Sequence, residues 1–280
     1  LPEPATSEAE AIARPDPLAA IEPSSIPPLD VQIDQVLLGG KALGASSFKL
    51  RPAANGVLFS ELKLNLSGLL ITGSAGWDGR KGASSSWYKG RLQGTDLAKV
   101  LLAWNYEPSV SSERFRVDAN VSWPGSPPWI SLARMSGSLN GSIHNGSFTE
   151  VKGSGSNALR VFGLLNFSAI GRRLRLDFSD LFGKGLAFDR VKVLLEGTNG
   201  VYVTREPLAI KGPSIDLQMN GTLDMLRQQI NAKLFVTLPV SNTVAMGALL
   251  VGAPIVAGAI FVVDKVADKM FGFGTSSLTR

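Results

Sequence analysis

The sequence predicts a mainly β protein with a few helices, built on one extended antiparallel sheet. Apolar and polar residues alternate along several stretches, which is typical of strands with one apolar face. Turn sequences that contain glycine separate these stretches, and roughly ten to twelve strands fit the spacing. The chain has 280 residues and is 44% hydrophobic, which excludes a disordered chain.

The charge balance and the rare residues exclude several functions. The chain holds 28 Lys and Arg against 23 Asp and Glu, a net charge of +5 that permits contact with acidic lipids or nucleic acid but demands neither. The absence of cysteine excludes a disulfide scaffold, a thiolate zinc site and a cysteine nucleophile. The single histidine, His144, excludes a multi-histidine metal site.

Residues 1–28 are predicted to be a proline-rich linker. Each proline removes a backbone donor and restricts the residue before it, so neither a helix nor a strand ladder is expected there. The segment is expected to be disordered or extended. Because the chain begins at Leu1 and shows no signal peptide, it is expected to be a fragment or a processed product.

Residues 29–240 carry the alternating pattern and are predicted to form the sheet. In the clearest run, residues 115–123, every second residue is apolar and the residues between them are Arg, Asp, Asn and Ser. The same period recurs in residues 29–33, 62–66, 215–219 and 230–238. Hairpin turns are expected at Asn55-Gly56, Asn145-Gly146 and Asn199-Gly200.

Two short helices are expected within this region. One lies near 95–104, where Thr95 can cap apolar residues at helical spacing. The other lies near 157–173 and ends in cations that suit the helix dipole. These cations could contact lipid headgroups, or could form a solvated helix end paired with nearby Asp residues. The headgroup candidates are Arg172, Arg173 and Arg175.

Residues 241–280 are predicted to form an apolar C-terminal helix or helical hairpin with a tail, broken near Pro254. The twenty residues from Val244 to Val263 carry no charge, and as a helix they would match the roughly 30 Å core of a bilayer. Residues 243–271 are therefore expected either to contact a membrane or to cover the end of the sheet. The candidate membrane-contact residues are Leu249, Leu250, Val251, Ile255, Ile260 and Phe261.

The sequence offers no catalytic constellation. His144 precedes Asn145-Gly146, where a surface turn histidine is the expected role, and Asp177 and Asp180 lie close to arginines and suit ion pairs. No phosphate-binding loop or dinucleotide fingerprint is found. We therefore expect no catalytic residue, no metal site and no cofactor, and an enzyme is the least favoured class. Nucleic acid is not expected either, because no aromatic platform accompanies the basic residues.

A large sheet with one apolar face has to bury that face. It can close as a barrel, fold over as a sandwich, or curl around a lipid. The apolar positions of the strongest alternating runs are expected to share this interior. They are Phe115, Val117, Val121, Leu217, Met219, Leu234 and Val236.

Several runs are distinctive. They are LRVFGLLNFSAIGRRLRLDFSDLF at 159–182, GLAFD at 185–189, GPSIDLQMNGTLD at 212–224, VTLPV at 236–240, SWPG at 122–125, and PLDVQID at 28–34 with Gly76-Trp77 downstream. Over roughly residues 28–271, they resemble the C-terminal region of the AsmA-like family of bacterial envelope proteins, in particular its large YhdP-type members. Ala253-Pro254 stands where this family leads us to expect Gly-Pro. The chain also ends before an expected Tyr- and Trp-containing strand, which implies truncation and an unpaired sheet edge.

The resemblance implies a curved β-groove that carries phospholipid between the inner and outer membranes of a diderm bacterium, without covalent chemistry. It implies a periplasmic, membrane-associated protein whose full-length form is anchored in the inner membrane. This chain would be the distal segment, with the outer membrane and other envelope proteins as candidate partners. The alternative is an envelope scaffold or assembly factor that aids outer-membrane biogenesis.

Overall fold

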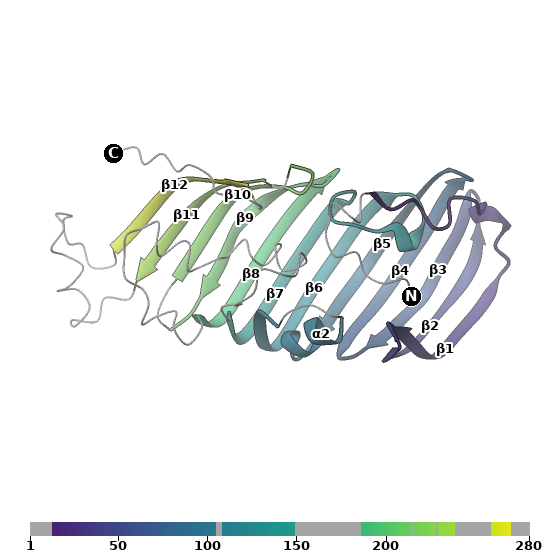
Figure 1. Ribbon diagram of the computed structural model, residues 1–280, viewed down its shortest axis with the longest axis horizontal. Coiled ribbons are helices and arrows are strands. Elements are labelled where there is room, and N and C mark those ends of the chain that lie inside the picture. The colour runs from purple at the N-terminus through teal and green to yellow at the C-terminus, as the bar shows by residue number, and fades with distance from the viewer. Residues whose placement is uncertain are drawn as a thin grey trace.

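The computed structural model describes residues 13–104, 108–148, 186–213, 216–227, 229–238 and 259–269. These residues form one antiparallel sheet of twelve strands in strict chain order, so each strand pairs with the next one along the sequence (Figure 1). The predicted mainly β fold is confirmed. The strands are β1 Leu29–Leu38, β2 Lys41–Ala53, β3 Gly56–Leu66, β4 Leu69–Arg80, β5 Ala83–Gly94, β6 Val110–Pro124, β7 Ser136–Phe148, β8 Leu186–Thr198, β9 Val201–Lys211, β10 Asp216–Asp224, β11 Gln229–Leu238 and β12 Ala259–Lys269.

The sheet stays open and curls into a groove. Its edge strands β1 and β12 lie at opposite ends of the molecule (Figure 1). Strand twist supplies part of the curvature, and irregular positions add to it. In β3 the register shifts between Phe59 and Leu62. In β4, Gly73 has φ +146°, and an added Cβ would lie 2.4 Å from the Lys89 carbonyl oxygen, so only glycine fits there.

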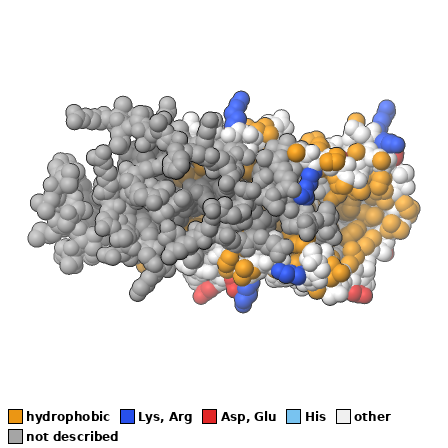
Figure 2. All heavy atoms as spheres, in the orientation of Figure 1, with side chains coloured by type: hydrophobic (Ala, Val, Ile, Leu, Met, Phe, Trp, Pro, Cys, Tyr) orange, Lys and Arg blue, Asp and Glu red, His pale blue; other side chains and the backbone are white. Residues whose placement is uncertain are grey.

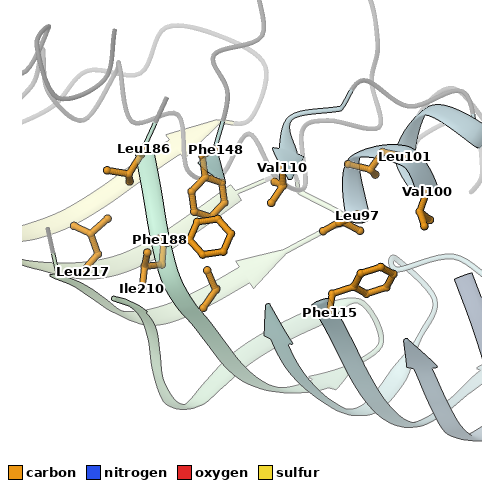
Figure 3. Close-up of a cluster of buried hydrophobic side chains, with 11 residues drawn as sticks. Leu97, Val100, Leu101, Val110, Phe115, Phe148, Leu186, Phe188, Ile210 and Leu217 are labelled. Carbon is orange, nitrogen blue, oxygen red and sulfur yellow. The ribbon is translucent and has the colours of Figure 1, made fainter. Parts of the chain in front are cut away.

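A row of apolar ladder partners, all buried except the partly buried Ile143, shows how the two faces of the sheet separate. Across β6 to β10 the row consists of Phe115, Ile143, Val191, Ile210 and Leu217. These side chains pack in one apolar cluster on the inner face of the groove, which we call the helix-side cluster (Figure 3). Because successive residues of a strand point to opposite faces, the residues beside them in sequence face outward.

A short helix, α2 (Leu97–Ala103), borders the groove at one end of the strands (Figure 1). It lies within the range where a helix was expected, but Asp96 caps it instead of Thr95. The Asp96 carboxylate accepts a hydrogen bond from the Lys99 backbone N–H at 3.3 Å, whereas the Thr95 carbonyl accepts one from the Ser112 hydroxyl at 2.8 Å. The helix contributes three buried side chains to the helix-side cluster, namely Leu97, Val100 and Leu101.

A second apolar cluster lies under the connection between β6 and β7, and we call it the loop-side cluster. The Tyr202 hydroxyl fastens this connection by donating to the Leu132 carbonyl at 2.6 Å. The Trp123 indole N–H donates to the Ser126 carbonyl at 3.0 Å. The buried members of the cluster are Ala119, Val121, Trp123, Ala133, Met135, Tyr202 and Met225.

The segment predicted to be a linker is in part a packed strap. Residues 14–28 lie along the strand ends opposite α2 and contain one 3₁₀ turn, η1 (Pro23–Ser25). The Asp16 carboxylate accepts hydrogen bonds from the backbone N–H (2.9 Å) and the hydroxyl of buried Ser126. The prolines exclude a helix or a strand ladder here. The segment can still pack on the sheet, because it forms turns and because its carbonyl and carboxylate oxygens accept hydrogen bonds. The apolar contacts of the strap with the sheet come from Leu18 and Ile26.

One predicted hairpin turn is wrong. The turns at Asn55 and at Asn199-Gly200 do join neighbouring strands, but Asn145-Gly146 and the adjacent His144 lie inside β7. Asn145 adopts φ +48° without reversing the chain, and its side-chain amide donates to Glu113 of β6 at 2.7 Å. The pairing with β6 and β8 on both sides therefore outweighs the local turn preference.

The predicted C-terminal helix is wrong over residues 259–269. These residues form β12, which pairs antiparallel with β11 from Gln229↔Lys269 to Leu238↔Ala259. Continuous apolarity does not distinguish a helix from a buried strand, and the β-branched and aromatic residues at 260–263 favour a strand. The rest of the segment and the predicted helix at 157–173 lie outside the described residues. Within the described ranges, no helix is long and apolar enough to cross a membrane.

Substituting Asp16 should loosen the strap. Asp16→Ala leaves the buried Ser126 N–H and hydroxyl without their acceptor, so we expect about 1–3 kcal/mol less free energy of unfolding in urea. Asp30→Ala is the matched control, because it removes only an exposed ion pair with Arg51. Equal effects of the two substitutions would show that the Asp16 anchor of the strap contributes no stability.

Shortening Ile210 should destabilise the sheet. Ile210 is 0% exposed in the buried row, between Val191 and Leu217, so Ile210→Ala should lower the free energy of unfolding by about 2–5 kcal/mol. Val203→Ala in the same strand is the control, since Val203 is 44% exposed, and it should change the value by less than about 0.5 kcal/mol. A small effect of Ile210→Ala would contradict the assigned core.

Candidate functional site

A track of apolar residues crosses the inner face beside the helix-side cluster and joins the loop-side cluster at Ala119. It consists of two neighbouring ladder rows that run from β3 to β8. One row is Leu64, Ile71, Leu92, Val117, Gly141 and Val193, and the other is Leu62, Gly73, Gly90, Ala119, Leu139 and Leu195. We call these residues the groove floor. None of them carries a charged or hydrogen-bonding side chain, so the floor is continuous apolar surface.

The floor is less buried than the clusters beside it. Its large side chains, such as Ile71, Leu92 and Leu139, remain partly exposed, whereas the clusters hold fully buried residues. On the same face, hydrophobic side chains gather over β1 to β4 (Figure 2). A contiguous, accessible apolar surface of this kind is typical of a binding site and not of a closed core. Small residues add room: at Gly141 an added Cβ would lie 2.9 Å from Val193.

The polar groups closest to the floor are already paired. The Tyr88 hydroxyl donates to the Thr72 carbonyl at 2.9 Å, and burial raises the pKa of Tyr88 to about 12. In β9 the Thr204 hydroxyl accepts from the Gly221 backbone N–H at 2.9 Å. Neither group is therefore available as an acid or a base at neutral pH.

Charged side chains interleaved with the floor lie on the outer face. In β6, Asp118 stands between Val117 and Ala119, and its carboxylate accepts hydrogen bonds from Arg116 (2.7 Å) and Arg91 (2.8 Å). These hydrogen bonds, with the one from Arg116 the larger, lower the pKa of Asp118. The carboxylate stays ionised on the outside, so the inner face can hold apolar chains without a buried charge nearby.

The residues predicted to share the interior take three positions. Three are buried within the two clusters: Phe115, Val121 and Leu217. Two are partly exposed on the inner face: Val117 on the floor and Met219 beside the helix-side cluster. Two lie in β11 directly opposite Met219 and Leu217 in the ladder: Leu234 and Val236.

The predicted membrane and headgroup residues fall largely outside the described part of the chain. Outside it lie Arg172, Arg173, Arg175, Leu249, Leu250, Val251 and Ile255. Ile260 and Phe261 belong to β12, where they pair with Thr237 and Val236 of β11. Their position in a strand ladder differs from the helical position that was expected.

Several floor residues were not identified from the sequence. Leu92 of β5 and Leu139 of β7 belong to strands rich in Gly and Ser, in which the alternation of apolar residues is diluted. A weak signal was present in β7, where Leu139, Gly141 and Ile143 follow at two-residue spacing. Their ladder partners, which the sequence does not specify, place them on the floor.

Comparison with known proteins identifies the family. The Intermembrane phospholipid transporter YhdP of Escherichia coli (strain K12) is 28% identical over 201 residues, covering 72% of this chain and 16% of that protein. The chain thus spans a minor part of this relative. No solved structure matches. A family model described as YhdP protein matches residues 3–273, which is nearly the whole chain. The resemblance seen in the sequence is therefore confirmed, and the chain belongs to the YhdP family.

Proposed function

We propose that this chain is a segment of a lipid-transfer conduit, in which the groove floor carries the acyl chains of phospholipids and the headgroups stay in water. The observation that carries the proposal is the continuous, partly exposed apolar floor of an open sheet. The name of the Escherichia coli relative, an intermembrane phospholipid transporter, supports the choice of phospholipid as passenger.

The proposed mechanism is physical and needs no covalent chemistry. Moving a CH₂ group from water to an apolar surface gains about 0.8 kcal/mol, so exposing a sixteen-carbon chain to water costs on the order of 10 kcal/mol. A floor that stays apolar from strand to strand removes most of that barrier at every step. Since the floor binds through contact area alone, the affinity for a lipid should rise steadily with acyl length.

The dimensions of the floor suit an acyl chain. Neighbouring strands lie about 4.8 Å apart, so the five spacings from β3 to β8 give roughly 24 Å of track. One leaflet of a bilayer contributes about 15 Å of hydrocarbon, half of its core. The track is therefore longer than the hydrocarbon part of one leaflet. A second lipid can enter one end of the track before the first lipid has left the other end.

The location of the segment is also part of the proposal. On the resemblance stated above, the segment lies in the periplasm at the outer-membrane end, and the full-length protein is anchored in the inner membrane. Because β12 begins at Ala259, the uncharged residues left before it are 244–258. As a helix they would reach about 22 Å, less than the roughly 30 Å of a bilayer core. We therefore favour a segment that dips into the outer membrane over one that spans it.

A charge on the floor should remove lipid from the groove. Val117 is partly exposed there, so Val117→Asp should leave the protein folded and reduce bound phospholipid several-fold, measured by mass spectrometry of extracted lipid per mole of protein. Asn120→Asp adds the same charge to the outer face of the same strand and should leave lipid unchanged. Unchanged lipid in a folded Val117→Asp protein would reject the floor as the path. Stoichiometric binding of an outer-membrane protein by lipid-free chain would instead support the assembly role.

Replacing residues 243–258 by a short Gly-Ser linker should weaken membrane binding while preserving β12. We expect the variant to float with liposomes much less than the intact chain, because the contiguous apolar stretch is removed. Circular dichroism should show an unchanged β signal. Equal flotation of both proteins would contradict the membrane-contact role of this segment.

A further inference from the structure

A row of basic residues lies on the outer face, directly behind the buried row of the helix-side cluster. Across β6 to β9 the ladder pairs Arg114 with His144, His144 with Arg190, and Arg190 with Lys211. Each of these residues adjoins a member of the buried row, so alternation places it on the opposite face. Lys192 flanks the same row in β8. We call Arg114, His144, Arg190, Lys192 and Lys211 the basic patch.

The cations of the basic patch are exposed and form no ion pair within the described residues. This holds for Arg114, Arg190, Lys192 and Lys211. Elsewhere on the sheet several exposed cations do form ion pairs. Lys49 contacts Glu61 at 2.6 Å, and Arg227 contacts Asp224 at 3.0 Å. What distinguishes the basic patch is that four exposed cations without ion pairs to other described residues lie together on the adjacent strands β6, β7, β8 and β9 around His144.

Such an arrangement costs stability in the isolated chain. Like charges that lie directly opposite one another in a ladder repel, as Arg190 and Lys211 do. The field at the centre is positive: burial first, and then the charges of Arg114, Arg190 and Lys192, lower the pKa of His144. Proteins typically keep a destabilising arrangement of this kind, with like charges opposite one another, at functional sites such as the binding site for a partner.

The acidic residues nearby lie at the margin of the basic patch. Glu113 accepts a hydrogen bond from Asn145 at 2.7 Å, Asp189 precedes Arg190, and Asp216 lies opposite Lys211 at the β10 end. They delimit a positive area that is centred on β7 and β8. The cations at the centre would therefore attract an anionic partner, and the carboxylates at the margin would repel it.

We propose that the basic patch docks an acidic polypeptide segment of a partner protein. Carboxylates of such a segment can form charge-assisted hydrogen bonds with Arg114 and Arg190. A membrane surface fits less well, because the ladder neighbours Ser142 and Ala209 are small and provide no apolar side chain to insert. Because the patch and the groove floor occupy opposite faces, a partner can bind while the groove is loaded.

The test uses the full chain and a fluorescein-labelled poly-glutamate peptide, with binding measured by fluorescence anisotropy. The variant Arg114→Gln, Arg190→Gln, Lys192→Gln removes three unpaired charges and relieves repulsion, so it should fold. We expect it to bind the peptide at least about tenfold more weakly than the unmodified chain. The control Lys49→Gln, Arg205→Gln, Arg227→Gln removes the same net charge from cations that are paired with carboxylates, and it should retain binding.

The outcomes separate the possibilities. Patch-dependent peptide binding that weakens as salt rises from about 50 to about 200 mM supports the proposal. No binding by the unmodified chain, or equal loss in both variants, overturns it. Patch-dependent flotation with phosphatidylglycerol vesicles in the absence of peptide binding also overturns it, in favour of a membrane surface. Lipid occupancy of the groove should be the same in all three proteins, so this test is independent of the transfer function.

Discussion

The structure depends on the alternation of side chains across one antiparallel ladder. Direct ladder partners share a face, so the buried row from Phe115 to Leu217 fixes the register of five strands at once. A slip of one residue would bring Arg114 and Arg190 into the helix-side cluster and expose Phe115 and Val191. The cost of burying unpaired cations is far larger than that of any local irregularity, which makes this register strongly specified.

One part of the apolar face of this open sheet is buried and stabilises the fold, and another part stays accessible for binding. The helix-side and loop-side clusters are buried at the two ends of the strands, under α2 and the β6–β7 connection. The floor, which meets the loop-side cluster at Ala119, keeps its large side chains partly exposed. The clusters can therefore hold the sheet together without closing it, and the strap anchored by Asp16 ties down one border. A barrel or a sandwich would have buried the same residues and left no track.

The two faces also carry independent chemistry. Asp118 and its two arginine partners lie behind the floor, and the basic patch lies behind the helix-side cluster. One strand such as β6 thus contributes to the core, the floor and the charged outer surface. Two ligands are proposed, an apolar passenger on the inner face and an acidic partner on the outer face. They would contact different side chains.

The sequence by itself determined the strands with undiluted alternation, such as β6, and the mainly β class, because side-chain alternation is a local property of the chain. Tertiary contacts decided the rest. Leu92 and Leu139 became floor residues through their ladder partners, and Asn145 stayed inside β7 because β6 and β8 pair on both sides. Residues 14–28 docked through Asp16, and residues 259–269 became β12 because β11 offered a strand edge. Each outcome depends on a neighbour far away in sequence, which local patterns do not encode.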